Sequence, residues 1–347
     1  MRVSQVKMNI AIGLMADKTV VVTGANGFIA SWLVKLLLER GYNVRGTVRD
    51  PKDESKLRHL LELPGAQDRL VLYRAELMAE GDFDEVVDGA DCVMHTASKV
   101  SADFVDDPYK EIVDPAVKGT LNVLKSAAKT KTVKRVVYTS SMSAVVCSDR
   151  FVNRSEDDVV DETWWTDPDF CQKLEMYYHL GKTLAERAAF EYAKDAPFDL
   201  VSIVPCTVLG GLMQETVNWS SSEVLRILQG IQKQEDDMII PTNVAFVDVE
   251  DVATAHILAM ENSNAEGRHL AVSESVTIDY IALLLAKLYP QYKNVLKPDM
   301  KGMDEATFSK PLFKFSNDKL KHLGLNFTPI AGIVKKTVQS LQQFNLV

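Results

Sequence analysis

Residues 23–30, Thr23-Gly24-Ala25-Asn26-Gly27-Phe28-Ile29-Ala30, connect an apolar run at 19–22 to an amphipathic stretch at 31–38. A strand, a glycine-rich turn and a helix in this order offer a pyrophosphate the free backbone N–H groups and positive dipole end of the helix. Gly24 permits the tight turn, Gly27 lets the backbone approach the phosphates, and Ala30 replaces the third glycine of the usual pattern. The stretch predicts a dinucleotide-binding turn, with cofactor contacts from Gly24, Asn26, Gly27, Phe28 and Ile29.

The alternation of strand and helix continues outward from this turn. Strands are predicted at residues 19–22, 43–48, 70–75, 92–96, 135–140 and 200–205, and helices near 29–40, 55–63, 84–87, 115–129 and 176–194. Strands that alternate with helices form parallel β-α-β units with right-handed crossovers. The predicted fold class is therefore α/β, a Rossmann-type doubly wound parallel sheet. Ligands of such sheets bind beyond the carboxyl ends of the strands.

The pattern changes after residue 205. Helices are predicted at 220–230, 278–288 and 330–344, and a strand end followed by a helix at 246–260. We expect an N-terminal extension at 1–17 and a cofactor-binding Rossmann domain at 18–205, with a return of the chain to the sheet at 241–262. Residues 206–347 are expected to form a smaller, mainly helical C-terminal lobe that binds the substrate.

The composition excludes several classes of function. The 347 residues carry a net charge of −9, which disfavours a nucleic-acid-coating surface. No apolar run approaches the ~20 residues that cross a membrane, and the apolar residues near the N-terminus are interpreted as a loose extension rather than a signal peptide. The four cysteines lack zinc-site spacing and are expected to be reduced, so we predict a cytoplasmic protein with no metal.

The end of the second predicted strand indicates which dinucleotide binds. A site for NAD places an acidic residue there, but this chain has Val48 followed by Arg49, and Lys56 lies seven residues further on. A guanidinium can form bidentate hydrogen bonds with a 2′-phosphate, which favours NADPH/NADP+ over NADH. The alternative is that both cations are solvated and pair with the acidic residues at 50, 53 or 54. Further cofactor contacts are predicted at strand ends, from Glu76, Leu77, Ala97, Ser98 and Pro205.

A tyrosine and a lysine four residues apart, Tyr178 and Lys182, share one face of a predicted helix. A neighbouring ammonium, and the positive nicotinamide ring of an oxidised cofactor, favour the phenolate and are expected to lower the tyrosine pKa. The same spacing at 289–293 is rejected because a proline follows that tyrosine. Ser141, at the end of the predicted strand 135–140, can donate a hydrogen bond to a carbonyl oxygen, with Ser140 as the competing candidate.

Apolar and aromatic side chains near these groups suggest the walls of a substrate pocket. The predicted wall residues are Phe104, Met142, Val145, Tyr177, Met213 and Trp219, with Trp164 and Trp165 near a rim. Such a lining suits an apolar or aromatic carbonyl compound, although methionine and aromatic residues are more often core. His179 is expected to pack or face solvent, and His95 to be a hydrogen-bonded core histidine.

Together these motifs resemble the extended short-chain dehydrogenase/reductases over nearly the whole chain. The narrower similarity is to plant dihydroflavonol 4-reductases, cinnamoyl-CoA reductases and fungal aldehyde or ketone reductases, carried by residues 41–51, 95–98, 139–141, 181–186 and 314–320. The resemblance implies a catalytic triad of Ser141, Tyr178 and Lys182, and contacts to the NADPH phosphate from Arg49 and Lys56. It implies hydride transfer to a carbonyl carbon, with Tyr178 as the general acid.

The chain differs from those plant enzymes in one active-site stretch and at one further position. Cinnamoyl-CoA reductases typically carry Asn-Trp-Tyr-Cys-Tyr-Gly-Lys where this chain has residues 176–182, Met-Tyr-Tyr-His-Leu-Gly-Lys. Dihydroflavonol reductases carry a substrate-binding asparagine where this chain has Val145. We therefore expect an NADPH-dependent aldehyde or ketone reductase, acting on a small-molecule substrate as a monomer or homodimer. The alternatives are those two plant activities, a 3β-hydroxysteroid dehydrogenase-like enzyme, a sugar-nucleotide epimerase or a non-catalytic NADPH sensor.

Overall fold

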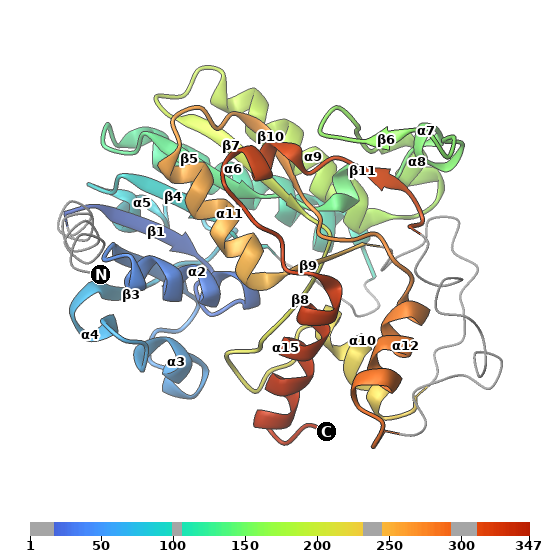
Figure 1. The fold of residues 1–347 in the computed structure, drawn as a ribbon. Helices are drawn as coiled ribbons and strands as arrows, with labels where there is room; N and C mark the ends of the chain where they lie inside the picture. The colour runs from blue at the N-terminus through green and yellow to red at the C-terminus, as the bar shows by residue number, and fades with distance from the viewer. Residues whose placement is uncertain (1–16, 99–105, 232–244, 293–310) are drawn as a thin grey trace.

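Seven parallel strands form the central sheet of the computed structural model, which describes residues 17–98, 106–231, 245–292 and 311–347 (Figure 1). They are β1 (Thr19–Thr23), β2 (Asn43–Val48), β3 (Leu70–Arg74), β4 (Cys92–His95), β5 (Arg135–Thr139), β7 (Asp199–Pro205) and β10 (Gly267–Ala271). Their spatial order is β10-β7-β5-β4-β1-β2-β3. The order reverses at β1, whose two neighbours are β2 and β4, and this reversal opens the ligand-binding crevice of a doubly wound sheet.

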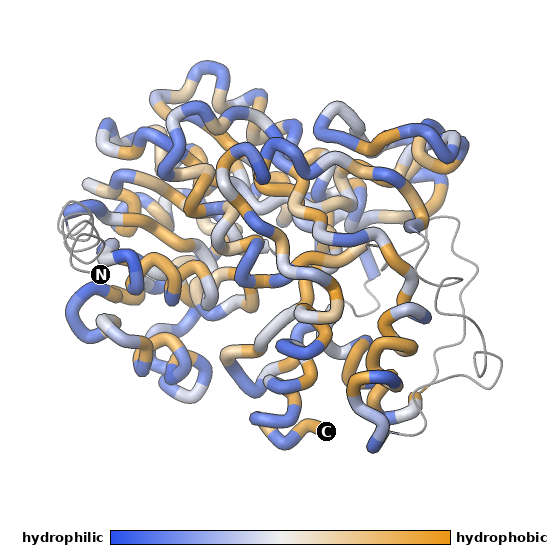
Figure 2. Tube along the Cα trace, viewed as in Figure 1, coloured by the Kyte–Doolittle hydropathy of each residue, from blue (hydrophilic) through white to orange (hydrophobic). Residues whose placement is uncertain are grey.

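The strands are rich in valine because helices cover both faces of the sheet, so side chains on both faces are buried. Every residue of β5 is buried, and four of the five residues of β1 are buried. On one face lie α2 (Phe28–Glu39) and α11 (Val249–Glu261), which pack against each other. On the other lie α5 (Asp84–Val87), α6 (Asp114–Lys129) and α9 (Tyr177–Ala193). Figure 2 shows the hydrophobic segments concentrated between these layers.

A second group of helices packs beside the carboxyl end of the sheet. It contains α10 (Trp219–Leu228), α12 (Ile278–Leu288) and α15 (Ile330–Gln343), which share one apolar cluster. Two small parallel sheets accompany it, β8 (Thr207–Leu209) with β9 (Phe246–Asp248), and β6 (Val159–Val160) with β11 (Lys314–Phe315). The short helices are α3 (Glu54–Leu61), α4 (Ala66–Arg69), α7 (Asp149–Val152), α8 (Pro168–Lys173), α14 (Asp318–His322), the π-helical η1 (Tyr109–Val113) and the 3-10 helix η2 (Met142–Ala144).

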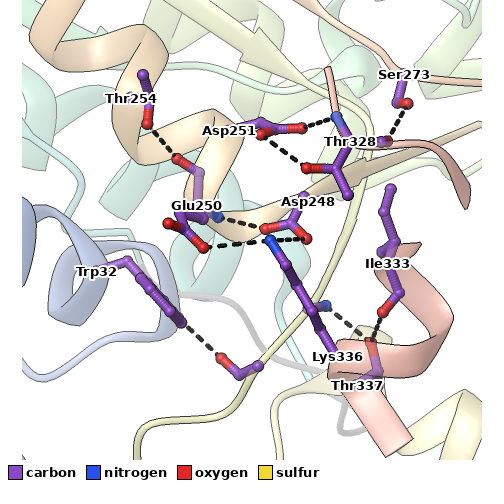
Figure 3. Close-up of polar contacts among 12 residues, drawn as sticks. Trp32, Asp248, Glu250, Asp251, Thr254, Ser273, Thr328, Ile333, Lys336 and Thr337 are labelled. Carbon is purple, nitrogen blue, oxygen red and sulfur yellow. Dashed lines mark hydrogen bonds and ion pairs between the residues drawn. The ribbon is translucent and has the colours of Figure 1, made fainter. Parts of the chain in front are cut away.

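Polar contacts join the start of α11 to α15 and to the segment around Thr328 that precedes α15 (Figure 3). Lys336 Nζ lies 3.0 Å from Asp248 Oδ2 and 3.2 Å from Glu250 Oε2. Asp251 accepts hydrogen bonds from the N–H and hydroxyl of Thr328, at 2.6 and 3.1 Å. Because Asp248 also caps α11 through the N–H of Glu250, one carboxylate orders both the helix start and the contact with α15.

The predicted fold class is confirmed, and the predicted strands of the first half agree with the observed ones to within one residue at either end. The seventh strand, β10, was not predicted. Its sequence, Gly-Arg-His-Leu-Ala, lacks an apolar run, and its pairing with β7 holds it in the sheet. The chain returns to the sheet through α11 and β10, extending past the expected 241–262, while β9 pairs with β8 outside the main sheet. Residues 1–16 and 241–244 lie outside the described residues.

Candidate active site

The glycine-rich turn lies at the carboxyl end of β1, beside the point where the strand order reverses. Gly24 has φ +65°, and a Cβ there would come within 3.3 Å of Ala97. Gly27 precedes α2 without a side-chain cap, and the first turn of the helix carries no acidic residue. The first N–H groups of a helix lack intrahelical partners, so this uncapped terminus suits an anionic group. The turn therefore fits the pyrophosphate of a dinucleotide, and it brings Asn26, Phe28, Ile29, Ala97 and Ser98 to the same edge.

The residues predicted to hold the adenosine end lie at the ends of β2 and β3. Arg49 is exposed directly after β2, whereas Lys56, 71% exposed, forms an ion pair with Asp53 at 2.8 Å. Glu76 Oε1 lies 3.8 Å from Arg74. Leu77 packs against Gly119, where an added Cβ would come within 2.5 Å of its side chain. The pairing of Lys56 with Asp53 matches the alternative considered from the sequence for that cation.

Ser141, Tyr178 and Lys182 meet at the carboxyl end of β5. Ser141 follows that strand and caps η2, accepting a hydrogen bond from the N–H of Ser143 at 3.2 Å. Lys182 Nζ donates to the carbonyl of Thr139 at 3.3 Å. A hydrogen bond with Ser141 lowers the pKa of Tyr178 against a larger opposing effect of burial. The competing Ser140 is buried, and its Oγ has no hydrogen-bond partner among the described residues.

Burial dominates the electrostatics of this triad. Burial raises the pKa of Tyr178, which is the reverse of the lowering expected from the nearby lysine. Burial also lowers the pKa of Lys182 to about 8, although the carboxylate of Glu186 opposes that shift. The sequence expectation was wrong for the free protein because it counted the neighbouring charge and omitted desolvation. A phenol with a raised pKa stays protonated at neutral pH, as a proton donor must.

Buried hydrogen bonds hold the strand ends around the triad. His95 Nδ1 lies 2.9 Å from the hydroxyl of Thr23, and its Nε2 lies 3.4 Å from that of Thr120, as expected for a satisfied core histidine. The Thr23 hydroxyl also accepts from the N–H of Ala97 at 3.0 Å. These bonds tie the end of β4 to the glycine-rich turn.

A second histidine, which the sequence did not point out, supports the triad from α11. His256 Nε2 lies 2.6 Å from the hydroxyl of Thr139, whose carbonyl accepts from Lys182. Its Nδ1 lies 2.7 Å from the carbonyl of Val252, so both ring nitrogens are engaged. Burial lowers the pKa of His256 to about 4 and keeps it neutral. The two residues lie 117 positions apart, and no local pattern signals such a contact.

The predicted pocket walls divide into several environments. Tyr177 packs edge-on against Tyr109, with ring centroids 5.6 Å apart, and Met142 begins η2 directly after Ser141. Val145 is 0% exposed and belongs to a packed apolar cluster with Cys147, so its side chain forms core rather than an open wall in this structure. His179, beside Tyr178, is half-buried and faces the tyrosine ring edge-on. Phe104 lies outside the described residues.

Met213 and Trp165 border two cavities, neither of which is lined by a triad residue. Met213 borders a cavity of about 470 Å³ together with Trp32 of α2 and Lys336 of α15, and no triad residue lines it. Trp165 borders a cavity of about 640 Å³ whose lining includes Arg187, whereas Trp164 is buried. Trp219 begins α10 and is 42% exposed. The sequence grouped these side chains by their apolar character, and the fold separates them.

The described ranges also bear on metal sites and membrane spans. Those residues contain no group of three or more histidine, cysteine, aspartate or glutamate side chains placed to hold a metal ion. Across the same part of the chain, no helix has the length and apolar character needed to cross a membrane.

Comparisons with known proteins give a consistent picture. A family model described as the NAD dependent epimerase/dehydratase family matches residues 20–273. The chain is 46% identical to cinnamoyl-CoA reductase CAD2 of Medicago truncatula, covering 93% of this chain and 95% of that protein. It is 38% identical to tetraketide alpha-pyrone reductase 1 of Arabidopsis thaliana, covering 94% and 96%. Yeast methylglyoxal/isovaleraldehyde reductase Gre2, solved in complex with NADPH, is 28% identical with a TM-score of 0.80, covering 95% and 100%.

Proposed function

Because this chain belongs to the NAD dependent epimerase/dehydratase family of extended short-chain dehydrogenase/reductases, we propose that it reduces an aldehyde or ketone to an alcohol with NADPH. The observation that carries the proposal is the meeting of Ser141, Tyr178 and Lys182 at the carboxyl end of β5, beside the sheet reversal that positions the glycine-rich turn. Relatives named as reductases, and a similar structure that holds NADPH, support the oxidoreductase class and the cofactor. A sensor of NADPH would not need the triad.

Each triad residue has a distinct task in this reaction. NADPH, when bound, supplies the hydride that reaches the carbonyl carbon. Ser141 Oγ donates a hydrogen bond to the carbonyl oxygen, where negative charge develops. Tyr178 Oη donates the proton to that oxygen, and burial keeps it protonated beforehand. Lys182, held by the Thr139 carbonyl, has further N–H donors for the ribose hydroxyls of the cofactor.

The substrate class follows from the residues next to the triad. Tyr177 and Met142 adjoin Tyr178 and Ser141 in the chain and offer aromatic and apolar surface, which suits an apolar or aromatic carbonyl group. We assign residues 18–205 to cofactor binding and 206–347 mainly to the substrate. A second candidate is the reduction of a cinnamoyl-CoA-like thioester, which the 46% identity to cinnamoyl-CoA reductase CAD2 favours.

The test compares the wild type with Tyr178→Phe and with Tyr192→Phe, a control that removes another phenolic hydroxyl from the same helix. NADPH consumption is followed with an aliphatic aldehyde, an aromatic aldehyde, a β-keto ester, a dihydroflavonol and a cinnamoyl-CoA thioester. Loss of the proton donor is expected to lower kcat by roughly 10²–10⁴-fold. NADPH binding, measured by fluorescence titration, should persist. Near-full turnover of Tyr178→Phe would overturn the assignment, and the ranking of substrates separates the two candidates.

A further inference from the structure

Two cysteine thiols lie in contact near the triad, and the proposed reaction does not use them. The Sγ atoms of Cys147 and Cys171 are 3.0 Å apart and joined by a hydrogen bond, although the residues are 24 positions apart in the chain. Both are 0% exposed and both are free thiols. Cys147 follows η2 and Cys171 lies in α8. A disulfide has an S–S distance of about 2.05 Å, so its formation needs about 1 Å of further approach.

Hydrogen bonds join the chain segments that carry the two thiols. The N–H of Asp167 donates to the carbonyl of Cys147 at 2.8 Å, and the N–H of Cys171 donates to the carbonyl of Asp167 at 3.0 Å. The N–H of Cys147 donates to the hydroxyl of Thr166 at 3.0 Å. Because these bonds hold both segments in register, the sulfur atoms can close on each other with little loss of chain entropy.

The pKa of Cys171 and a nearby cavity favour reaction of the pair with a small oxidant. The hydrogen bond shared by the two thiols lowers the pKa of Cys171 against the opposing effect of burial, and the thiolate is the reactive form of cysteine. The cavity of about 640 Å³ described above is lined by Ser148, which follows Cys147, and by Asp167, which is bonded to both cysteines. Neither cysteine lines the cavity itself, so a peroxide reaches the sulfur pair only by passing these flanking residues.

Both cysteines are connected to the catalytic groups by short segments. Ser141 caps η2, and the N–H of Val146, next to Cys147, donates to the carbonyl of Met142. On the other side, the N–H of Met176 donates to the carbonyl of Cys171 at 2.9 Å, two residues before Tyr178. Glu175, between Cys171 and Met176, has φ +56°, a backbone conformation uncommon for a residue with a side chain. Short hydrogen-bonded segments therefore link the two thiols to Ser141 and Tyr178.

We propose that Cys147 and Cys171 are a peroxide-sensitive modification site, whose reversible disulfide displaces the Ser141 and Tyr178 segments and lowers turnover. The Cys171 thiolate attacks one peroxide oxygen, forming a sulfenic acid and releasing hydroxide, which takes up a proton to become water. The Cys147 thiol attacks the sulfenic sulfur, the S–S bond forms and a second water leaves. Two thiols and one hydrogen peroxide thus give one disulfide and two waters. The effect on turnover rests on the proposed reductase function, whereas the disulfide does not.

The experiment treats the full-length protein with hydrogen peroxide, removes the excess with catalase and measures three properties. Non-reducing peptide mapping should show a Cys147–Cys171 linked peptide, and the free thiols should fall from four to two. The melting temperature should rise by several degrees because the bond closes a chain loop. Turnover should fall at least about fivefold, since a 1 Å misplacement of catalytic groups can cost far more. Dithiothreitol should reverse all three changes.

Three variants distinguish the outcomes. Cys171→Ala and Cys147→Ala should lose the linked peptide and keep their turnover after peroxide, while Cys92→Ala should respond as the wild type does. Absence of the linked peptide in wild type overturns the site. A peroxide-dependent loss that persists in Cys171→Ala would point instead to another oxidation, such as that of Met176, whose sulfur lies 3.5 Å from Cys147 Sγ. An unchanged kcat in protein mapped as fully linked would overturn the effect on turnover.

Discussion

Arg49 is the residue on which cofactor choice should depend. It is exposed at the end of β2, whereas Lys56 is engaged by Asp53 at 2.8 Å, so Arg49 is the freer cation for a 2′-phosphate. A hydrogen bond to a charged group contributes about 1.5–3 kcal/mol. Arg49→Ala should therefore raise KM for NADPH by roughly 10- to 100-fold and leave KM for NADH nearly unchanged, as measured by steady-state kinetics with both cofactors.

A matched control for that experiment is Arg58→Ala, which removes an exposed arginine from α3. The Arg58 side chain is 75% exposed and lies 3.9 Å from Glu62. The Arg58→Ala variant should leave the ratio of kcat/KM for NADPH to kcat/KM for NADH unchanged. If Arg49→Ala weakens the binding of NADPH and of NADH equally, Arg49 acts through the shape of the turn and does not bind the 2′-phosphate.

At the scale of single residues, sequence reasoning succeeds where chemistry is local. Gly24, Tyr178 and Lys182 could be picked out because each belongs to a short spacing with a known physical purpose. Val145 could not be assigned to core, nor His256 to the support of Thr139, because those environments depend on contacts between distant segments. The pKa of Tyr178 shifts in the direction opposite to the one expected for the same reason, since the degree of burial is a tertiary property.

At the scale of elements, a buried ion pair joins α9 to β10. Glu186 and Arg268 make two contacts of 3.1 Å, with the side chains 0% and 5% exposed. Arg268 also donates to the carbonyls of Trp164 and Ala144. Removing one partner of a buried pair leaves an uncompensated charge, which costs about 3–5 kcal/mol. Glu186→Ala should lower the free energy of unfolding by about that amount in urea denaturation, and Glu186→Gln by less.

The same helix offers the comparison for an exposed pair. Glu191 contacts Lys194 at 2.6 Å with both side chains more than half exposed, and exposed pairs contribute about 1 kcal/mol or less. Glu191→Ala should therefore change the unfolding free energy by no more than that. Equal losses for Glu186→Ala and Glu191→Ala would mean that burial does not set the strength of the pair. The Glu186–Arg268 pair also explains why β10 was not predicted. An arginine in this buried edge strand becomes favourable only through its partner on α9.

At the scale of the whole molecule, the buried histidines should make the protein sensitive to acid. Burial lowers the pKa of His95 to about 3 and those of His179, His256 and His269 to about 4, below the ordinary value near 6.5. The unfolded chain therefore binds more protons than the folded protein as the pH falls below 6.5. Stability from these groups is complete above the unfolded pKa and is lost as the pH falls towards 4.

Buried carboxyl groups limit the size of this effect, and burial raises the pKa of Asp248 among them. Burial raises the pKa of Asp251 to about 6, so its protonation favours the folded protein as the pH falls. The destabilising contributions of the four histidines exceed the stabilising contribution of Asp251. The free energy of unfolding should therefore drop by roughly 2–3 kcal/mol between pH 7.5 and pH 6.0. Urea denaturation at constant ionic strength measures this drop. His269→Leu should reduce it by about a quarter, because His269 is one of four equivalent contributors. A free energy that stays level or rises at pH 6.0 would show that the histidines are protonated in the folded state.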